Sequence, residues 1–229
     1  MNLVIATVGD ASYHKEWIKN NPNFDLVLLY YGDNPDTAIE YTKDTPQVYS
    51  AKGFKWWLIK SFVTSESEWL SKYEYIWFPD DDISISTEEI NEVFSIAKEY
   101  DLWLCQPSLK GYVSHRITCP QPDLLLRYTN FVEVMSPLMS LDTVRKLQDT
   151  FDVNYSSWGL DGIWHHLLGS PQDKVAIIDK ISMTHTKPTG NPELYSKIPN
   201  GVQYDEQLAY DKFTNGTRFP QTEYSKIKL

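Results

Sequence analysis

Three consecutive carboxylates, Asp80, Asp81 and Asp82, follow Pro79 at the end of the apolar run Tyr73–Phe78. Adjacent carboxylates repel one another and raise each other's pKa values unless a cation neutralises them. Oxygen-rich sites of this kind suit Mg²⁺ or Mn²⁺, usually alongside the phosphates of a substrate. The alternative is an exposed acidic turn before a helix, whose N-terminus also favours Asp. Because a predicted strand runs straight into the triplet, we favour a functional site.

A second acidic motif is Trp158-Gly159-Leu160-Asp161. Gly159 allows a sharp turn, and Asp161 falls in the first turn of the predicted helix Leu160–Leu168, off its apolar stripe. Pairing with the helix dipole is the structural alternative for this carboxylate. His165 lies four residues further on and is expected beside Asp161 as a local pair rather than as a catalytic dyad.

An imidazole and a lone glutamate complete the candidate acidic site. Met183-Thr184-His185 follows the predicted strand Lys174–Asp179, and a single His there is more often structural than a ligand. Its place beyond a sheet edge still permits a metal shared with Asp82. Glu133 lies inside the apolar run Phe131–Met135, where a buried carboxylate needs a partner. It either faces a cleft and holds a hydroxyl group, or points outward from a half-exposed strand.

Three basic side chains are candidates for binding phosphate. Lys52 and Lys55 flank Gly53 near the end of an early strand and could balance a diphosphate, although surface lysines would look the same. Arg116 lies in a loop, where it either pairs with phosphate or is a solvated charge.

Apolar, β-branched runs alternate with helical patterns over about the first hundred residues. This alternation predicts an α/β fold with a mostly parallel sheet, in which ligands bind beyond the carboxyl ends of the strands. Ser86 and Glu89 have the spacing of a capping box and predict a helix start. After Pro188 the chain is polar and irregular. The predicted strands are Leu3–Val8, Leu26–Tyr31, Tyr73–Phe78, Asp101–Cys105, Phe131–Met135 and Lys174–Asp179, and the predicted helices include His14–Asn20, Gly53–Leu70 and Leu160–Leu168.

The composition narrows the class of protein. The 229 residues carry 21 basic and 31 acidic side chains, a formal net charge of −10, which disfavours nucleic-acid binding but not a nucleotide bound with a divalent cation. Aromatic residues make up 14% of the chain, which suits stacking on sugar rings as well as a thick core.

The two cysteines and the N-terminus bear on the compartment. Cys105 and Cys119 match no zinc or redox spacing, and two reduced thiols are expected, with a single bridge as the alternative. No stretch approaches the roughly 20 apolar residues of a membrane span, and the N-terminus lacks a basic region. We therefore expect a cytoplasmic protein without a signal peptide.

The order of the three motifs, a strand ending in Asp-Asp-Asp, then Trp-Gly-Leu-Asp, then Met-Thr-His, resembles GT-A glycosyltransferases. The chain resembles more closely the family catalogued as domain of unknown function 707. The resemblance covers roughly Lys55 to Gly190 and implies a GT-A-type, Rossmann-like mixed sheet, mostly parallel and flanked by helices. The blocks that carry it are KWWLIKSF, YEYIWFPDDDI, CQPSLKGYVSHRIT, FVEVMSPLMS, WGLDGIWHHL and VAIIDKISMTHTKPTG.

The wider GT-A class implies roles for the matching residues. The ends of its Asp-x-Asp motif imply ribose binding by Asp80 and metal binding by Asp82. Inverting members carry an acidic motif, often Glu-Asp where this chain has Leu-Asp, which implies that Asp161 is the catalytic base. The segment here is one residue shorter than the Met-x-x-His of galactosyltransferases, and only His185 is carried over, as a second ligand for Mn²⁺ or Mg²⁺. The remaining expectations are nucleotide-sugar binding by Asp81, Lys55 and Arg116, and acceptor binding by Glu133 and Trp158.

The resemblance thus implies a metal-dependent, inverting glycosyltransferase that moves a sugar from a nucleotide-diphosphate sugar, a UDP-sugar first, to a carbohydrate acceptor. One alternative is a sugar-phosphate nucleotidyltransferase, which normally has a glycine-rich signature where this chain offers only Val8-Gly9-Asp10. Another is a non-catalytic GT-A domain that binds carbohydrate or nucleotide. We expect a single domain over 1–229, with a nucleotide-binding half at 1–105, an acceptor and catalytic half at 106–190, and a tail or lid at 191–229.

Overall fold

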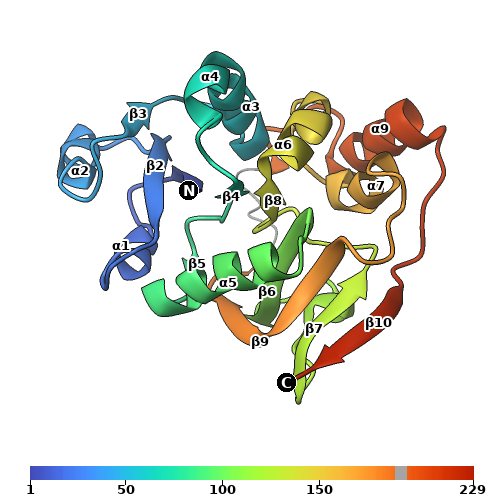
Figure 1. Cartoon of the computed structure of the whole chain (residues 1–229). Coiled ribbons are helices and arrows are strands. Elements are labelled where there is room, and N and C mark those ends of the chain that lie inside the picture. The colour runs from blue at the N-terminus through green and yellow to red at the C-terminus, as the bar shows by residue number, and fades with distance from the viewer. Residues whose placement is uncertain (189–194) are drawn as a thin grey trace.

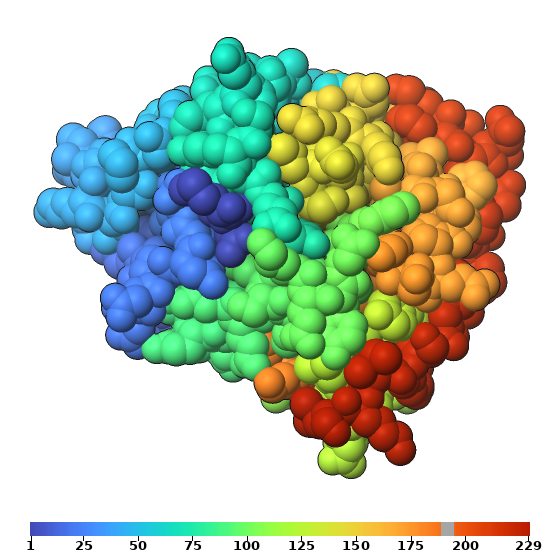
Figure 2. All heavy atoms as spheres, viewed as in Figure 1, coloured from blue at the N-terminus to red at the C-terminus, as the bar shows by residue number. Residues whose placement is uncertain are grey.

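The computed structural model describes residues 1–188 and 195–229, which form one mixed sheet between two sets of helices (Figure 1). The strands follow the order β10-β7-β9-β6-β8-β4-β1-β2-β3, and β5 pairs separately with β9. In the space-filling view from the same side, the blue N-terminal residues and the red C-terminal residues lie on opposite sides of the green middle of the chain (Figure 2).

The first part of the sheet is parallel, as the alternating pattern predicts. Alternate residues of its central strand enter different cores: Leu3 and Ile5 pack on one face, and Val4 and Ala6 on the other. A strand buried on both faces needs apolar residues at every position, which explains the unbroken apolar run. The parallel strands are β1 (Asn2–Val8), β2 (Phe24–Tyr30), β3 (Val48–Ser50) and β4 (Tyr75–Trp77).

The second part of the sheet mixes directions. Since β8 is antiparallel to both β4 and β6, and β6 is parallel to β9, the strands β1, β4, β6 and β9 all run the same way. Their carboxyl ends therefore share one edge of the sheet. The strands of this part are β5 (Ile83–Ser84), β6 (Leu104–Gly111), β7 (Leu124–Thr129), β8 (Leu138–Ser140), β9 (Val175–His185) and β10 (Glu223–Lys228).

Helices cover both faces of the sheet. On one face lie α1 (His14–Trp17), α2 (Pro35–Tyr41) and α5 (Thr87–Glu99), and both hydrogen bonds of the predicted capping box between Ser86 and Glu89 are present. None of the helices in the described residues is long and apolar enough to cross a membrane. On the other face lie α3 (Lys55–Ser65), α4 (Ser67–Leu70), α6 (Leu141–Leu147), α7 (Leu160–Leu167) and α9 (Val202–Thr214).

The predicted strand Phe131–Met135 is wrong, because this segment is a buried loop between β7 and β8. Its apolar side chains Phe131, Val132 and Met135 enter the core, which explains the strand-like pattern. Its backbone groups bond outside any ladder: the Glu133 amide donates to the Gln106 side chain at 2.6 Å.

The last two predicted segments also differ from the structure. The final strand continues past Asp179 to His185, with a register irregularity against β6 where the polar residues interrupt the apolar run. The segment expected to be irregular contains α9 and β10, although residues 191–194 lie outside the described part of the chain. Their packing surfaces are supplied by distant elements, which a local pattern does not reveal.

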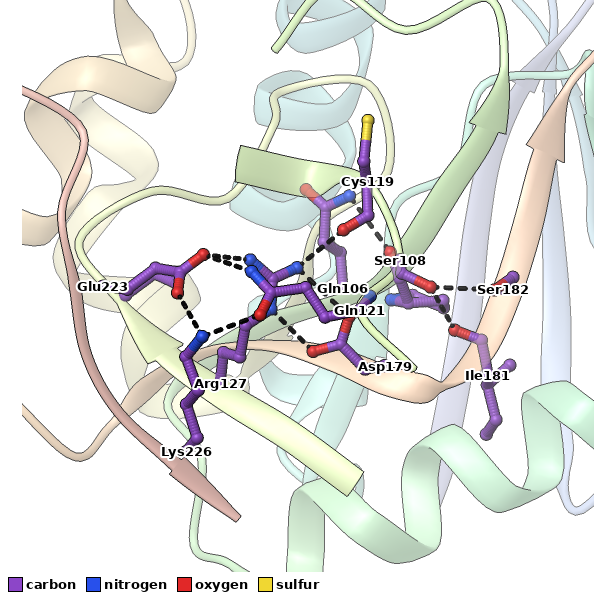
Figure 3. A network of polar contacts seen from close by, with 12 residues as sticks. Gln106, Ser108, Cys119, Gln121, Arg127, Asp179, Ile181, Ser182, Glu223 and Lys226 are labelled. Carbon is purple, nitrogen blue, oxygen red and sulfur yellow. Dashed lines mark hydrogen bonds and ion pairs between the residues drawn. The ribbon is translucent and has the colours of Figure 1, made fainter. Parts of the chain in front are cut away.

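A buried arginine attaches β10 to the sheet (Figure 3). The Arg127 guanidinium, fully buried, donates to both carboxylate oxygens of Asp179, to Glu223 and to the Cys119 carbonyl. Asp179 also accepts from the Gln121 amide at 2.8 Å. The network therefore fixes β10 and the segment after β6 in one arrangement. Cys105 and Cys119 are both free thiols.

Helix α9 packs closely against α7. Gly159 has a φ of 87°, and a Cβ on Gly162 would overlap the Tyr210 hydroxyl group of α9. The glycines therefore serve the approach of the two helices as well as the turn that begins α7.

Candidate active site

The Asp triplet lies at the shared carboxyl edge, directly beyond β4, and its first member is held by Lys55. The Lys55 ammonium donates to Asp80 Oδ1 at 2.5 Å and to the carbonyls of Phe78 and Met135 at 2.9 and 2.6 Å. Burial raises the pKa of Asp80, and the Lys55 charge works against this rise. Lys55 begins α3, so this helix start is pinned to the loop that carries the triplet.

The second member, Asp81, joins the triplet to the end of β1. Its Oδ2 accepts from the Gly9 amide at 2.8 Å and from the Tyr31 hydroxyl at 3.0 Å. Burial raises the pKa of Asp81. Gly9 and Tyr31 were not among the candidates from the sequence, although Gly9 ends the first predicted strand.

The third member, Asp82, lies against His185, as the shared-metal prediction requires. Asp82 Oδ2 and His185 Nε2 are 3.3 Å apart, and both side chains are largely buried. Pairing of Ile83 with His185 across β5 and β9 brings them together. The other oxygen, Asp82 Oδ1, is buried and has no hydrogen-bond partner among residues 1–188 and 195–229.

The His185 ring is oriented by the backbone. Its Nδ1 lies 2.8 Å from the Tyr112 carbonyl, an acceptor, so Nδ1 carries the proton and Nε2 faces Asp82. Burial lowers the pKa of His185, but Asp82 and the Tyr112 carbonyl outweigh burial and the net pKa is raised. Tyr112 was missed as a candidate, although it lies within the block CQPSLKGYVSHRIT.

Glu133 and Asp161 place two further carboxylates at this site. Glu133 is 3% exposed, and its Oε2 has no hydrogen-bond partner in the described part of the chain. Burial, followed by the Asp161 charge, raises the pKa of Glu133 to about 8. Burial also raises the pKa of Asp161 to about 7, against the effect of backbone hydrogen bonds from Val134 and Gly162. Asp80 and His185 are close enough to affect Glu133 electrostatically, so the loop containing Glu133 faces the triplet rather than solvent.

The other residues predicted from the sequence lie further from the Asp triplet or contact other parts of the chain. Trp158 is 41% exposed in the loop before α7, and its indole nitrogen donates to the Tyr195 hydroxyl at 3.1 Å. Arg116 is exposed on the 3₁₀ helix Arg116–Thr118, and within residues 1–188 and 195–229 no hydrogen bond or ion pair joins its side chain to the triplet. Lys52 is exposed and bonds Asp33 at 2.7 Å.

The prediction that His165 pairs with Asp161 is wrong, since His165 Nε2 lies 2.9 Å from the Pro171 carbonyl instead.

A cavity of about 320 Å³ opens between the loop after β1, the helices α1 and α2, and Lys187 beyond the end of β9. Lys187, two residues beyond His185, lines it and lowers the pKa of Asp81 through its charge. The sequence offered one signal for this cavity, the turn Gly9-Asp10 at the end of the first strand. Its other lining residues include Asp10, Ser12, Tyr13, Thr37 and Tyr41.

The arrangement is unusual in its charge balance. Asp80, Asp82, Glu133 and Asp161 face one region, and two of their buried oxygens lack hydrogen-bond partners among the residues that the structure describes. No group of three or more His, Cys, Asp or Glu side chains in residues 1–188 and 195–229 has the arrangement of a complete metal site. Such a region can hold a proton, accept from hydroxyl groups, or bind a cation that takes its remaining ligands from a substrate.

Comparison with known sequences identifies the family. The sequence model described as "Protein of unknown function (DUF707)" matches residues 5–127, more than half of the chain. The chain belongs to the DUF707 family. The match begins earlier and ends earlier than the blocks quoted above, and it includes the Asp triplet, Lys55 and Arg116. No curated protein matches this DUF707 chain.

Solved structures with the same fold include two glycosyltransferases. The structure of GalNAc-T7 with UDP, GalNAc and Mn²⁺ has a TM-score of 0.66 at 9% identity, over 93% of this chain and 49% of the other. The structure of S. aureus TarS 1–349 with UDP-GlcNAc has a TM-score of 0.55 at 10% identity, over 93% of this chain and 73% of the other. The DUF707 chain thus spans about half the length of the GalNAc-T7 chain, and it has the GT-A-type fold.

Proposed function

We propose that this DUF707 protein is a metal-dependent, inverting glycosyltransferase that uses a nucleotide-diphosphate sugar, a UDP-sugar first, and a carbohydrate acceptor. The observation that carries the proposal is the convergence of Asp82, His185, Glu133 and Asp161 at the carboxyl edge of a GT-A-type sheet. Two solved neighbours of the same fold contain UDP or UDP-GlcNAc, which supports the donor class.

The residues present fit a divalent cation. Asp82 has a buried oxygen without a partner, and His185 presents Nε2 while Nδ1 bonds a carbonyl, the arrangement common among metal-ligating imidazoles. We propose that Asp82 and His185 hold Mn²⁺ or Mg²⁺, with diphosphate oxygens and water as the other ligands. When bound, such a cation would offset the charge that grows on the leaving diphosphate.

The donor lies along the triplet in this proposal. Lys55 restrains the Asp80 carboxylate, which we assign to the ribose hydroxyls, as expected for the first acid of the motif. The four carbonyl and carboxylate contacts of Lys55 make it a support for Asp80 rather than an open diphosphate ligand. Asp81 fixes the loop after β1, beside the cavity that would receive the nucleotide.

Asp161 is assigned as the base. A pKa of about 7 lets the carboxylate be deprotonated at neutral pH and still accept a proton strongly. Asp161 takes the proton of the acceptor hydroxyl as that oxygen attacks the anomeric carbon, and the diphosphate leaves from the opposite face with inversion. Glu133, whose pKa of about 8 keeps it protonated at neutral pH, holds another acceptor hydroxyl with its unpartnered oxygen.

We further propose that the two parts of the chain bind different substrates: residues 1–105 bind the nucleotide-sugar donor, and residues 106–190 bind the acceptor. In this division Asp80, Asp81 and Asp82 serve the donor, and Glu133, Trp158 and Asp161 serve the acceptor. Arg116, exposed beyond β6, is left as a peripheral contact for the donor phosphates.

The test is a panel of UDP-, GDP- and dTDP-sugars with Mn²⁺ or with EDTA, scored by release of the free nucleotide and by thermal shift. We expect UDP to raise the melting temperature more with Mn²⁺ than without it, and Asp82→Ala to remove that difference. Asp161→Asn should keep the shift and lose turnover, while the exposed Asp173→Asn serves as the matched control. Undiminished turnover in Asp82→Ala and Asp161→Asn would exclude these assignments, and UDP binding indifferent to Mn²⁺ would favour a non-catalytic domain.

A further inference from the structure

Exposed aromatic rings gather around the loop that precedes Asp161. Trp57, on the first turn of α3, is 39% exposed and stacks on Tyr155, with ring centroids 5.0 Å apart and an interplanar angle of 12°. Trp158, 41% exposed, contacts Tyr195 edge to face at 6.1 Å. Other large apolar side chains are exposed elsewhere in the described part of the chain, including Tyr31, Tyr49, Tyr112 and Tyr204, but Trp57 and Trp158 are the only tryptophans among them.

The polar atoms of the two indoles are already bonded to the protein. Trp57 Nε1 donates to the Asn154 carbonyl at 2.6 Å, and Trp158 Nε1 donates to the Tyr195 hydroxyl. What remains exposed is ring carbon surface. Exposed apolar surface of this kind marks sites of interaction, because burying a Trp or Tyr ring is strongly favourable.

A buried polar network fixes the loop that carries Tyr155 and Trp158. Asp205 of α9, 1% exposed, accepts from the Tyr155 and Ser156 amides at 2.9 and 2.7 Å. The Asn154 side chain, also buried, donates to the carbonyls of Trp158 and Asp205 and accepts from the Ser157 amide. Ser157 has a φ of 69°, a conformation that a non-glycine residue rarely adopts without such support.

These hydrogen bonds make the loop that carries Tyr155 and Trp158 more rigid than packing alone requires. The ring edges are held in place before any ligand arrives, which reduces the ordering cost of binding. The nearby cation Lys60 is already paired with two carboxylates, Asp152 at 2.8 Å and Asp149 at 3.7 Å, so its charge is not available to an anionic ligand. A ligand with flat apolar faces and hydroxyl edges fits this surface better than an anion or a charged peptide, and saccharide rings have that character.

The aromatic rings adjoin the proposed site of the acceptor hydroxyl along the chain. Trp158 is followed directly by Gly159 and by α7, whose first turn carries Asp161. We propose that Trp57, Tyr155 and Trp158 form a platform for a neutral glycan chain of several sugars, whose terminal unit reaches Asp161. The inference rests on the proposed function and adds that the acceptor is an oligosaccharide or polysaccharide rather than a single sugar.

The test is binding without any donor, by isothermal calorimetry and tryptophan fluorescence. The probes are cellohexaose, chitohexaose, maltohexaose, xylohexaose and mannohexaose, each compared with its disaccharide. We expect at least one hexasaccharide to bind about tenfold more tightly than its disaccharide, and Trp57→Ala and Tyr155→Ala to weaken it about tenfold. Tyr49→Ala, an exposed tyrosine on β3, is the matched control and should bind as the parent does.

Variants that fail to fold are recognised by thermal melts, and Trp57→Leu and Tyr155→Leu then replace them. Equal affinity for hexasaccharides and disaccharides, or unchanged affinity in the ring variants, would overturn the platform. Loss of glycan binding in the ring variants of a protein that transfers no sugar would support the platform and refute the transferase. Sugar transfer with no preference for longer acceptors would support the transferase and refute the platform.

Discussion

Two groups of buried charges, built from the same residue types, differ in how they are satisfied. Around Arg127, the guanidinium meets Asp179, Glu223 and a backbone carbonyl, and opposite charges balance (Figure 3). Around Asp82 and Glu133, the carboxylates outnumber the cations, and two buried oxygens have no partner within the described ranges 1–188 and 195–229. The first group stabilises the fold as it stands, whereas the second becomes balanced only when a proton, a cation or a hydroxyl group is added.

The pKa directions express the same contrast. In the Arg127 group, burial raises the pKa of Glu223, but hydrogen bonds from Arg127 and Lys226 outweigh it and the net pKa is lowered. In the other group, burial raises the pKa of both Glu133 and Asp161. A carboxylate with a lowered pKa stabilises the fold in its charged form, and one with a raised pKa is poised to bind protons.

The largest expected effect is on the balanced group. Arg127→Met should lower the free energy of unfolding by about 3–5 kcal/mol, because Asp179 would remain buried without its partner. Denaturation with guanidinium chloride measures the change. The double variant Arg127→Met/Asp179→Leu should recover part of the loss. A loss below about 1 kcal/mol in the single variant would contradict the structural role of this group.

The opposite result is expected in the unbalanced group. Asp161→Asn should reduce sugar transfer about 10³-fold, as for loss of a general base, while leaving the free energy of unfolding unchanged or higher. The reason is that the charge removed is one that burial already disfavours. Initial rates and denaturation curves of the same preparation test both parts. Full activity, or marked destabilisation, of the Asp161→Asn variant would mean that Asp161 is a structural charge like those around Arg127.

The dependence of stability on pH should separate the groups. Because the folded pKa of Glu133 is about 8, above its ordinary value of 4.5, its contribution is fully present below about pH 4.5 and is lost as the pH rises through 8. Glu223 has a lowered pKa, so its contribution is lost as the pH falls. One proton corresponds to a slope of about 1.4 kcal/mol per pH unit.

Chemical denaturation between pH 5 and 8 tests this slope. Glu133→Gln should flatten the decline in stability toward pH 8, while Glu223→Gln should leave that decline intact. Identical slopes for the parent and Glu133→Gln would show that Glu133 titrates normally.

The smallest expected effect serves as a reference outside both groups. Ser86→Ala removes the capping box of α5 and should cost about 1 kcal/mol of stability. Thermal melts measure it, and sugar transfer should stay at the parental level because the hydrogen bonds of the cap join Ser86 to Glu89 and not to the triplet. A large loss of activity would mean that α5 supports the site more directly than its contacts indicate.

Local patterns were sufficient for the elements that depend on their own residues. The apolar runs of β1, β2 and β4, the capping box of α5 and the glycine-led start of α7 were all predictable, since each is encoded within a few neighbouring positions. The acids at the end of β4 were predictable as a candidate site for the same reason, because their position at the end of a strand is visible in the sequence.

Tertiary structure decided the rest. The apolar loop around Glu133 looked like a strand because burial, and not pairing, selects its side chains. The tail became α9 and β10 because Gly162 and Arg127, distant in sequence, provide their contacts. The approach of His185 to Asp82 depends on pairing between β5 and β9, a contact across a hundred residues. Sequence thus determined which groups carry charge, and the folded sheet determined which of those charges are left without a partner.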